Sequence, residues 1–247
     1  CCSRSLRPVV REFELLGHVY AANRLLPPEV SIPPGDDMAA MRLTDVNLLI
    51  AVDQVIEGRH VVVDEDPALV GRKAVARNLS DVAAMAARPV ATVASVALPK
   101  RYGQARALAL FEGVRATADL FGCPLIGGDT AIHQDPNAPL VLSVTILAAP
   151  AWPGARVVTR RGGQPGDGVY VTGQLGGSLE PGGGGRHLRF APRIHEAMAL
   201  LELLGERLHS MIDVSDGVGR DAAHLTGEGT EITLDARAVP THDGLSW

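Results

Sequence analysis

Hydrophobic and polar positions alternate with two different periods along this chain, and each period predicts a different kind of element. Apolar residues recur at helical spacing over 12–26, 67–87 and 103–121, and Pro27-Pro28 end the first of these runs. Short continuous apolar runs, which are typical of buried strands, lie at 47–53, 90–99, 123–129 and 139–149. The stretch 31–40 (SIPPGDDMAA) is turn-rich. Strands that alternate with helices indicate an α/β or α+β fold.

The composition changes near residue 150, and we expect two domains, 1–150 and 151–247. Residues 150–168 are rich in Pro, Gly and Arg, which is typical of a boundary. The second domain is predicted to be α/β as well, with strands at 168–172 and 210–214, a helix at 192–207, and a further helix and strand after them. The glycine run at 181–185 is expected to be a surface loop, because no GK[ST] follows it.

Composition and charge exclude several classes of protein. Of 247 residues, 46% are hydrophobic and 21% charged, a balance that supports a core and argues against disorder. A net charge of −5 and 4% aromatic residues offer no general affinity for nucleic acid. No apolar run reaches the roughly 18 residues of a membrane-spanning helix. Cys1, Cys2 and Cys123 form no CxxC pair, and we see no secretory signal, so a cytoplasmic protein without a disulfide scaffold is expected.

Aspartates recur at the ends of short apolar runs or beside glycines: Asp36, Asp37, Asp53, Asp129, Asp213 and Asp216. Asp81, in RNLSDVAAM, joins them as a further candidate. A carboxylate is costly inside a core unless it is paired or bound to a cation, so these positions are expected at a surface or cleft. Taken singly, each Gly-Asp pair is also explained as a turn, and Asp213 as a helix cap. Asp81 lies within an apolar helical stretch, where turn chemistry explains an aspartate less easily.

Several carboxylates along one rim repel one another unless a cation lies among them. Aspartate oxygens suit Mg²⁺, which usually shares its remaining positions with phosphate oxygens. The P-loop pattern GxxxxGK[ST] is absent, as are HExxH, GxSxG and a kinase HRD motif. The sequence therefore predicts magnesium-dependent phosphate chemistry without a P-loop.

Eight motifs between residues 12 and 240 carry a family resemblance: EFELL (12–16), GDD (35–37), VDQVIEGRH (52–60), GRKAVARNLSDVAAMAARP (71–89), GGDT (127–130), RVVTRRGGQPGD (156–167), VTGQLGGS (171–178) and IDVSDGV (212–218). With them the chain resembles the thiamine-monophosphate kinases, which belong to the ATP-binding superfamily that includes aminoimidazole ribonucleotide synthetase. The resemblance implies transfer of the γ-phosphoryl group of ATP to thiamine monophosphate, giving thiamine diphosphate and ADP. It also implies a homodimer whose N-terminal domains, each a mixed sheet with helices on one face, join their sheets beside the nucleotide.

The motif positions imply a set of site residues. The implied Mg²⁺ ligands are Asp37, Asp53, Asp81, Asp129, Asp213 and Asp216. The implied ATP contacts are Gly128, Asp129, Arg160 and Ser215, and the implied substrate contacts are Asp53 and His60. Catalysis is assigned to Asp81, Asp53 and Arg160, because a phosphate nucleophile needs alignment and charge neutralisation rather than a general base. Lys73 is expected on an exposed helix face without a chemical role.

Two features depart from the family pattern. Ala51 and Val52 stand where the family usually has hydroxyl residues, so one magnesium position is expected to be weakened or to use backbone oxygen. The family's GGEDYEL-like motif, which supplies part of the thiamine pocket, is not among these residues. Relative to the family, the domain 151–247 is therefore expected to be truncated.

Two other interpretations stay open. One is another ATP-using enzyme of the superfamily, such as selenophosphate synthetase, although Cys1 and Cys2 lack the glycine-rich context which that enzyme uses. The other is a non-catalytic nucleotide-binding dimer, which would be stabilised by ATP and Mg²⁺ without turnover.

Overall fold

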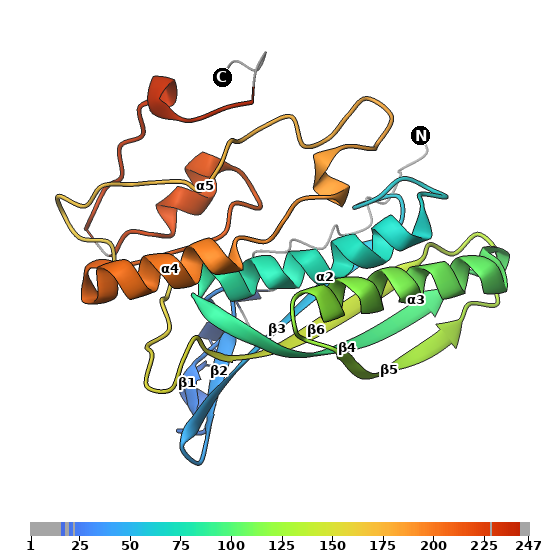
Figure 1. The fold of residues 1–247 in the computed structure, drawn as a ribbon, viewed down its shortest axis with the longest axis horizontal. Coiled ribbons are helices and arrows are strands. Elements are labelled where there is room, and N and C mark those ends of the chain that lie inside the picture. The colour runs from blue at the N-terminus through green and yellow to red at the C-terminus, as the bar shows by residue number, and fades with distance from the viewer. Residues whose placement is uncertain (1–15, 18–19, 22, 228, 243–247) are drawn as a thin grey trace, which may run out of the picture.

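A computed structural model of the chain describes residues 16–17, 20–21, 23–227 and 229–242. Its centre is a six-stranded mixed sheet of order β1-β2-β3-β6-β4-β5, in which only β4 and β5 are parallel neighbours (Figure 1). The strands are β1 (Val30–Ile32), β2 (Ala39–Leu43), β3 (Val46–Ile56), β4 (Ala87–Leu98), β5 (Leu125–Ile132) and β6 (Val141–Pro150). Helices α2 (Pro67–Ala84) and α3 (Gly103–Leu120) cover one face of this sheet. This architecture confirms the predicted fold class.

The helix α2 begins where the sequence places a capping signal. The Asp66 carboxylate accepts the backbone N–H of Ala68 at 2.9 Å, and Pro67 occupies the first turn, where its missing N–H costs nothing. Helices α2 and α3 approach closely through glycines, since a Cβ at Gly71 would lie 2.3 Å from Leu110 O and one at Gly113 2.2 Å from Ala68 O. The two helices therefore form one layer over the sheet.

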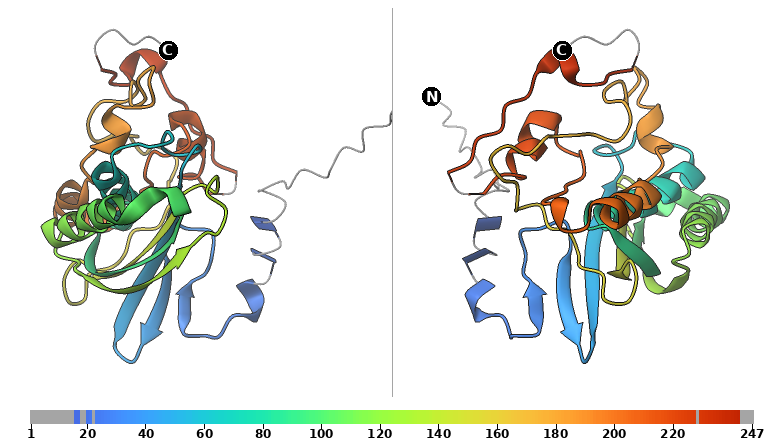
Figure 2. Two further views of the ribbon diagram at one scale, coloured as in Figure 1. Left: turned by 90° about the vertical axis from the view of Figure 1, so that its right-hand side faces the viewer. Right: turned by 60° about the vertical axis from the view of Figure 1, so that its left-hand side comes forward.

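The alternation of side chains along β3 and β6 separates the two faces of the sheet. In β3, Leu49, Ala51 and Val55 are buried on the helix side, whereas Val52 on the other side is 63% exposed. The strand β6 shows the same alternation of buried and half-buried residues. Within the described residues no helix covers the second face (Figures 1 and 2).

Two features of residues 151–242 follow the prediction. Helix α4 (Ile194–Leu204) lies beside α2, and its residues Ile194, Ala197 and Leu201 join the same hydrophobic core as the sheet. A second helix, α5 (Val218–Ala223), follows the predicted IDVSDG segment. The short 3₁₀ turns of the described chain are η1 (Asn23–Leu25), η2 (Lys100–Tyr102), η3 (Arg186–Leu188), η4 (Gly205–Arg207) and η5 (Ala236–Ala238).

The strands predicted beyond residue 150 are wrong. The segments 168–172 and 210–214 are not strands, nor are the described residues after α5, and only single bridges such as Gly163 to Thr226 and Leu175 to Thr241 occur there. An apolar run becomes a strand only when a neighbour completes its hydrogen-bond ladder, and the described chain provides none. Tyr170, at the centre of the first segment, is 93% exposed.

At the N-terminal side, two predictions meet the described residues only in part. Most of the helix predicted over 12–26, including Phe13 and Val19, lies outside them, although residues 16–17 and 20–21 are helical. The turn-rich stretch 31–40 holds the predicted turn, at 33–38, but it also contains the end of β1 and the start of β2, which pair as an antiparallel hairpin. None of the helices that the structure describes is long and apolar enough to cross a membrane.

Candidate active site

Three aspartates from distant parts of the sequence meet between β3, α2 and the loop before α5. Asp37 comes from the turn between β1 and β2, Asp81 from the last turns of α2, and Asp213 from the loop that leads into α5. One carboxylate oxygen of each lies within 4.8 Å of the others. We call Asp37, Asp81 and Asp213 the carboxylate cluster. All three were predicted from separate motifs as magnesium ligands, and the structure brings them together.

Burial makes the negative charge of the carboxylate cluster costly. Burial, together with the carboxylates of Asp213, Asp53 and Asp37, raises the pKa of Asp81 to about 9. Burial likewise raises the pKa of Asp37 to about 7, although the guanidinium of Arg160 opposes the shift. The pKa of Asp213 is also raised by burial. The carboxylate cluster therefore has a strong tendency to bind protons or a metal cation.

Arg160 is the cation that the protein itself supplies to the carboxylate cluster. Its Nη2 donates to Asp37 Oδ1 at 2.5 Å, and its backbone N–H donates to Asp36 Oδ1 at 3.2 Å. The two bonds join the loop after residue 150 to the GDD turn. Arg160, predicted as a catalytic and ATP-binding residue, thus lies at the carboxylate cluster.

The donor set of the carboxylate cluster fits a hard divalent cation. Asp37 Oδ2 is buried and accepts no hydrogen bond from the described residues, which leaves a lone pair free to coordinate. Ser80 Oγ donates to Asp213 Oδ2 at 2.7 Å and orients that carboxylate. Oxygen ligands with such supporting hydrogen bonds are typical of Mg²⁺ sites.

Asp53 lies beside the carboxylate cluster but outside it. Its carboxylate accepts two bonds from Arg77 of α2, from Nε to Oδ2 at 3.1 Å and from Nη2 to Oδ1 at 3.3 Å. Burial raises the pKa of Asp53, and Arg77 opposes this shift. Arg77 was not predicted, although it stands four residues before Asp81 and therefore on the same helix face.

His60 is held as a neutral imidazole. Its Nδ1 accepts the backbone N–H of Ile56 at 2.9 Å. Burial and the charges of Arg77, Lys73 and Arg59 lower its pKa to about 4. The Nε2–H of His60 remains as a donor.

The expectation that Lys73 is exposed is wrong. Lys73 is 8% exposed, and its ammonium donates to the His60 carbonyl at 2.5 Å and contacts His187 Nδ1 at 2.6 Å. The loop after β3 and the turn η3 cover this position of α2, and neither is visible in the pattern of the helix itself. Lys73 thus connects the His60 loop with the turn η3.

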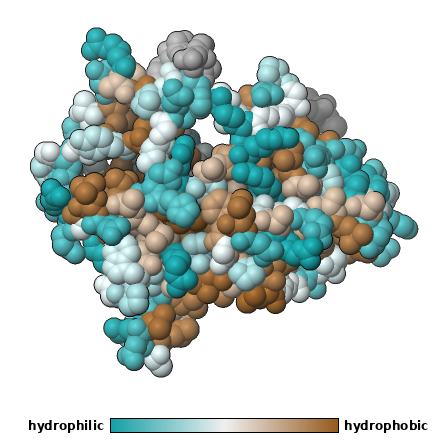
Figure 3. Space-filling model, viewed as in Figure 1, coloured by the Kyte–Doolittle hydropathy of each residue, from teal (hydrophilic) through white to brown (hydrophobic). Residues whose placement is uncertain are grey.

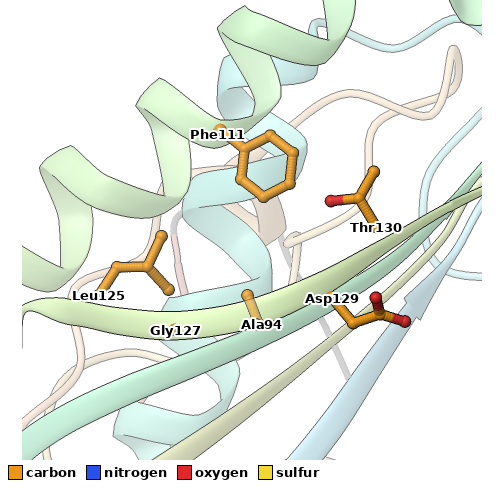
Figure 4. Close-up of a pocket in the computed structure, with 7 residues that line it drawn as sticks. Ala94, Phe111, Leu125, Gly127, Asp129 and Thr130 are labelled. Carbon is orange, nitrogen blue, oxygen red and sulfur yellow. The ribbon is translucent and has the colours of Figure 1, made fainter.

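Asp129 and Gly128 lie on β5, apart from the carboxylate cluster. A pocket of about 350 Å³ lies there between α3 and β5, lined by Ala94, Phe111, Leu125, Gly127, Gly128, Asp129 and Thr130. Figure 4 shows the Asp129 carboxylate directed away from Phe111, while Thr130 lies on the Phe111 side. We call this the β5 pocket. Because β4 and β6 separate β5 from β3, Asp129 does not join Asp53 or the carboxylate cluster within this chain.

Ser215 and Asp216 lie in a loop that Asp221 organises. The backbone N–H groups of Ser215, Asp216 and Gly217 all donate to Asp221 Oδ2, at 2.9, 3.0 and 3.1 Å. Asp216 is exposed and forms an ion pair with Arg220 at 3.8 Å, outside the carboxylate cluster. Asp221 was not predicted, because its role depends on the loop that wraps around it.

The first half of the chain is similar to a known family of domains. Residues 35–149 match the family model for AIR synthase related protein, N-terminal domain, and this segment holds the strands β2 to β5, nearly all of β6, and the helices α2 and α3. The two loops that supply Arg160 and Asp213, one before α4 and one after it, follow that segment in the sequence. Over residues 35–149, which include Asp37 and Asp81, the chain is therefore similar to the N-terminal domain of the AIR synthase-related proteins.

The chain belongs to the thiamine-monophosphate kinase family. It is 32% identical over 240 residues to thiamine-monophosphate kinase of Rhodopirellula baltica, covering 92% of this chain and 72% of that protein. It is also 32% identical over 254 residues to the Escherichia coli K12 enzyme, covering 95% and 74%. A solved structure of AaThiL complexed with AMPPCP and TMP superposes with a TM-score of 0.72 at 26% identity, covering 90% of this chain and 72% of that one.

Proposed function

We propose that this chain transfers the γ-phosphoryl group of ATP to thiamine monophosphate, giving thiamine diphosphate and ADP. The observation that carries the proposal is the carboxylate cluster with Arg160 bonded to it, in a chain of this kinase family. The AaThiL complex with AMPPCP and TMP supports a pair of substrates of this kind.

The Asp37, Asp81 and Asp213 carboxylates would hold Mg²⁺. When bound, Mg²⁺ neutralises negative charge that develops on the transferring phosphoryl group. The fit rests on the chemistry of three carboxylates and on the free lone pair of the buried Asp37 Oδ2. Asp129 and Asp216 are proposed to contact metal or nucleotide at the periphery, from β5 and from the loop before α5.

Charge neutralisation, and not proton abstraction, is what the protein contributes to the transfer. The acceptor is a phosphate whose second pKa is about 6, so it is an anion near neutral pH and needs no general base. Arg160 places a guanidinium where two anionic groups must approach each other. The neutral His60 and the paired Asp53 are proposed to face the acceptor, with His60 Nε2–H as a hydrogen-bond donor.

The nucleotide is proposed to lie over the β5 pocket. Phe111 offers an aromatic surface to a base, and Gly128 allows a close backbone approach. Asp129 and Ser215 are proposed to contact the nucleotide from either side, and Arg160 its phosphates. The β5 pocket and the carboxylate cluster are separated within one chain. Either the triphosphate of the bound nucleotide spans this separation, or a second copy of the chain brings its own pocket to the cluster.

We propose that two copies of the chain associate through the uncovered face of the sheet. Val52 is 63% exposed on this face. Ile126 of β5 is 64% exposed, and Figure 3 shows hydrophobic residues gathered below the helices, on the side of the molecule that holds β4 and β5. Exposed apolar surface of this kind is typical of an interface. Light scattering coupled to size-exclusion chromatography tests this, with V52D expected to dissociate the pair and L108D, at an exposed position of α3, expected to leave it intact.

The decisive experiment measures thiamine diphosphate from thiamine monophosphate, ATP and Mg²⁺ with the purified chain. Asp81→Asn is expected to abolish turnover, whereas Asp119→Asn, an exposed aspartate of α3, is expected to retain it. Near-normal turnover in Asp81→Asn would overturn the proposed site. Thermal stabilisation by ATP and Mg²⁺ without product would instead support the nucleotide-binding interpretation.

A further inference from the structure

Asp53, which lies beside the carboxylate cluster, accepts a hydrogen bond from one guanidinium on each of its two oxygens, whereas no aspartate of the cluster does so among the described residues. Arg77 meets it with a bidentate fork, Nε to Oδ2 at 3.1 Å and Nη2 to Oδ1 at 3.3 Å. The third guanidinium nitrogen, Nη1, donates to the Gln54 carbonyl at 3.2 Å, which holds the plane of the fork against β3. Both carboxylate oxygens of Asp53 are therefore already occupied by a fixed positive charge.

The residues around Asp53 offer few other ligands to a metal ion. Ala51 and Val52, directly before it in β3, carry no side-chain oxygen. Val52 also faces the opposite side of the sheet from the carboxylate cluster. A cation at Asp53 would have to share both carboxylate oxygens with the positive charge of Arg77, and it would find no hydroxyl ligand on the two residues before Asp53. This position does not fit a metal ion in the way that the carboxylate cluster does.

Arg77 also places its positive charge near both Asp53 and Asp81, where a second metal ion would otherwise neutralise these carboxylates. It stands one helical turn from Asp81 on α2. Burial raises the pKa of both Asp81 and Asp53, and the charge of Arg77 opposes that rise. The Arg77 side chain is 30% exposed, so the guanidinium reaches the edge of the site rather than the core. Arg77 thus neutralises the negative charge of Asp53 with a side chain of the protein itself, and no exchangeable ion is needed.

We propose that Arg77 takes the place of a metal ion at Asp53. In this chain the metal is held by Asp37, Asp81 and Asp213, and Asp53 is a member of a fixed ion pair and not a metal ligand. The inference deepens the proposed function, because it names which carboxylates take metal, and it rests on that function. Arg77 is a positioning residue under this proposal, since it acts through Asp53.

Binding of Mn²⁺ in the absence of nucleotide tests the proposal without any need for turnover. Isothermal titration would compare the wild type with Asp53→Asn/Arg77→Met, in which the two opposite charges are removed together. The double variant is expected to bind the same number of Mn²⁺ ions with an affinity within a few-fold of the wild type. Loss of a site, or a fall in affinity of about 100-fold, would show that Asp53 is a ligand and overturn the proposal.

Arg77→Met alone gives the complementary result. It exposes the Asp53 carboxylate beside the carboxylate cluster, so we expect an additional Mn²⁺ ion or an affinity raised by about tenfold. Arg115→Met, which removes a guanidinium from the surface pair with Glu112 on α3, is the matched control and should change nothing. No gain in Mn²⁺ binding by Arg77→Met would contradict the proposal.

Failure of the proposed metal site and failure of the Arg77 proposal would give different titration results. Equal Mn²⁺ binding by the wild type and Asp81→Asn would overturn the carboxylate cluster as the metal site. The Arg77 proposal would still be decided by the gain in Arg77→Met and by its absence in the double variant. Far-UV circular dichroism and a thermal melt of each variant establish that it is folded before its titration is interpreted.

Discussion

Arg160 Nη2 lies 2.5 Å from Asp37 Oδ1, although the two residues are 123 positions apart in the sequence. The contact joins a loop beyond the sheet to the turn between β1 and β2, and it brings a guanidinium to the edge of the carboxylate cluster. The side chain of Asp37 is only 4% exposed, so this charge pair is shielded from solvent and salt.

Arg160→Met is expected to lower kcat by about 100-fold or more, because it removes a donor that stabilises charge in the transfer. Arg161→Met is the matched control, since Arg161 is adjacent in sequence, exposed, and outside the carboxylate cluster. Steady-state kinetics of both variants give the comparison. A similar small loss in the two variants would mean that Arg160 acts only as a surface charge.

Without metal, the free energy of unfolding is expected to fall as the pH rises. Asp37 and Asp81 have folded pKa values of about 7 and about 9, both above the ordinary 3.8 of an unfolded aspartate. Their contribution to stability is therefore fully present below about pH 4 and is lost as the pH rises through 7 and then 9. Urea unfolding at a series of pH values in EDTA measures the slope.

Added Mg²⁺ is expected to flatten that slope, since it compensates the same charges above pH 7. Asp81→Asn should flatten it in EDTA as well, because one of the two groups no longer titrates. A metal-free protein whose stability is constant between pH 6 and pH 9 would contradict the electrostatic account of the carboxylate cluster.

Gly128→Ala is expected to destabilise the protein by about 1–3 kcal/mol or more. A Cβ at Gly128 would lie 1.8 Å from the Ala94 carbonyl oxygen of β4, so β4 and β5 would have to separate. Gly127→Ala provides the control, because a Cβ there meets nothing within 4 Å. Chemical denaturation compares the two, and equal stability of both variants would contradict the close packing of β4 and β5.

Ser80→Ala is expected to weaken Mg²⁺ binding by about tenfold, the usual effect of losing a hydrogen bond to a metal ligand. Ser80 Oγ donates to Asp213 Oδ2 at 2.7 Å, and this bond opposes the effect of burial on the pKa of Asp213. Calorimetric titration with Mg²⁺ gives the affinity. Ser95→Ala, an exposed position on β4, should leave the affinity unchanged.

Lys73→Met is expected to lower the free energy of unfolding by about 1–3 kcal/mol, because the His60 carbonyl and His187 Nδ1 lose a charged donor. Lys100→Met, at an exposed position in η2, is the control. Thermal unfolding measures both. If the two variants melt alike, the buried position of Lys73 contributes nothing to holding the His60 loop.

Local pattern was enough to predict the frame of the sheet. The apolar runs within β3, β4, β5 and β6, and the helical spacing of α2 and α3, carry their own period, so each element could be recognised from its own residues. The strands predicted at 168–172 and 210–214 failed because a strand also requires a partner, and pairing between segments cannot be read from either one. The short strands β1 and β2 were not predicted, because each overlaps the turn-rich stretch 31–40. Their pairing, β1 with β2 and β2 with β3, cannot be read from their own residues.

The candidate site, too, was predicted in part from the sequence and decided in part by the tertiary structure. Chemical type and local context singled out Asp37, Asp81 and Asp213, because several carboxylates along one rim already point to a cation. Arg160 was implied only by the family resemblance. Their meeting within 4.8 Å, the distance of Asp129 from them and the burial of Lys73 were decided only by the tertiary structure. The same holds for Arg77 and Asp53, which α2 and β3 bring together across 24 positions of sequence. Spacing along a chain determines which face of one element a side chain occupies, whereas the packing of elements against one another determines what that side chain meets, how far it is desolvated, and hence its charge.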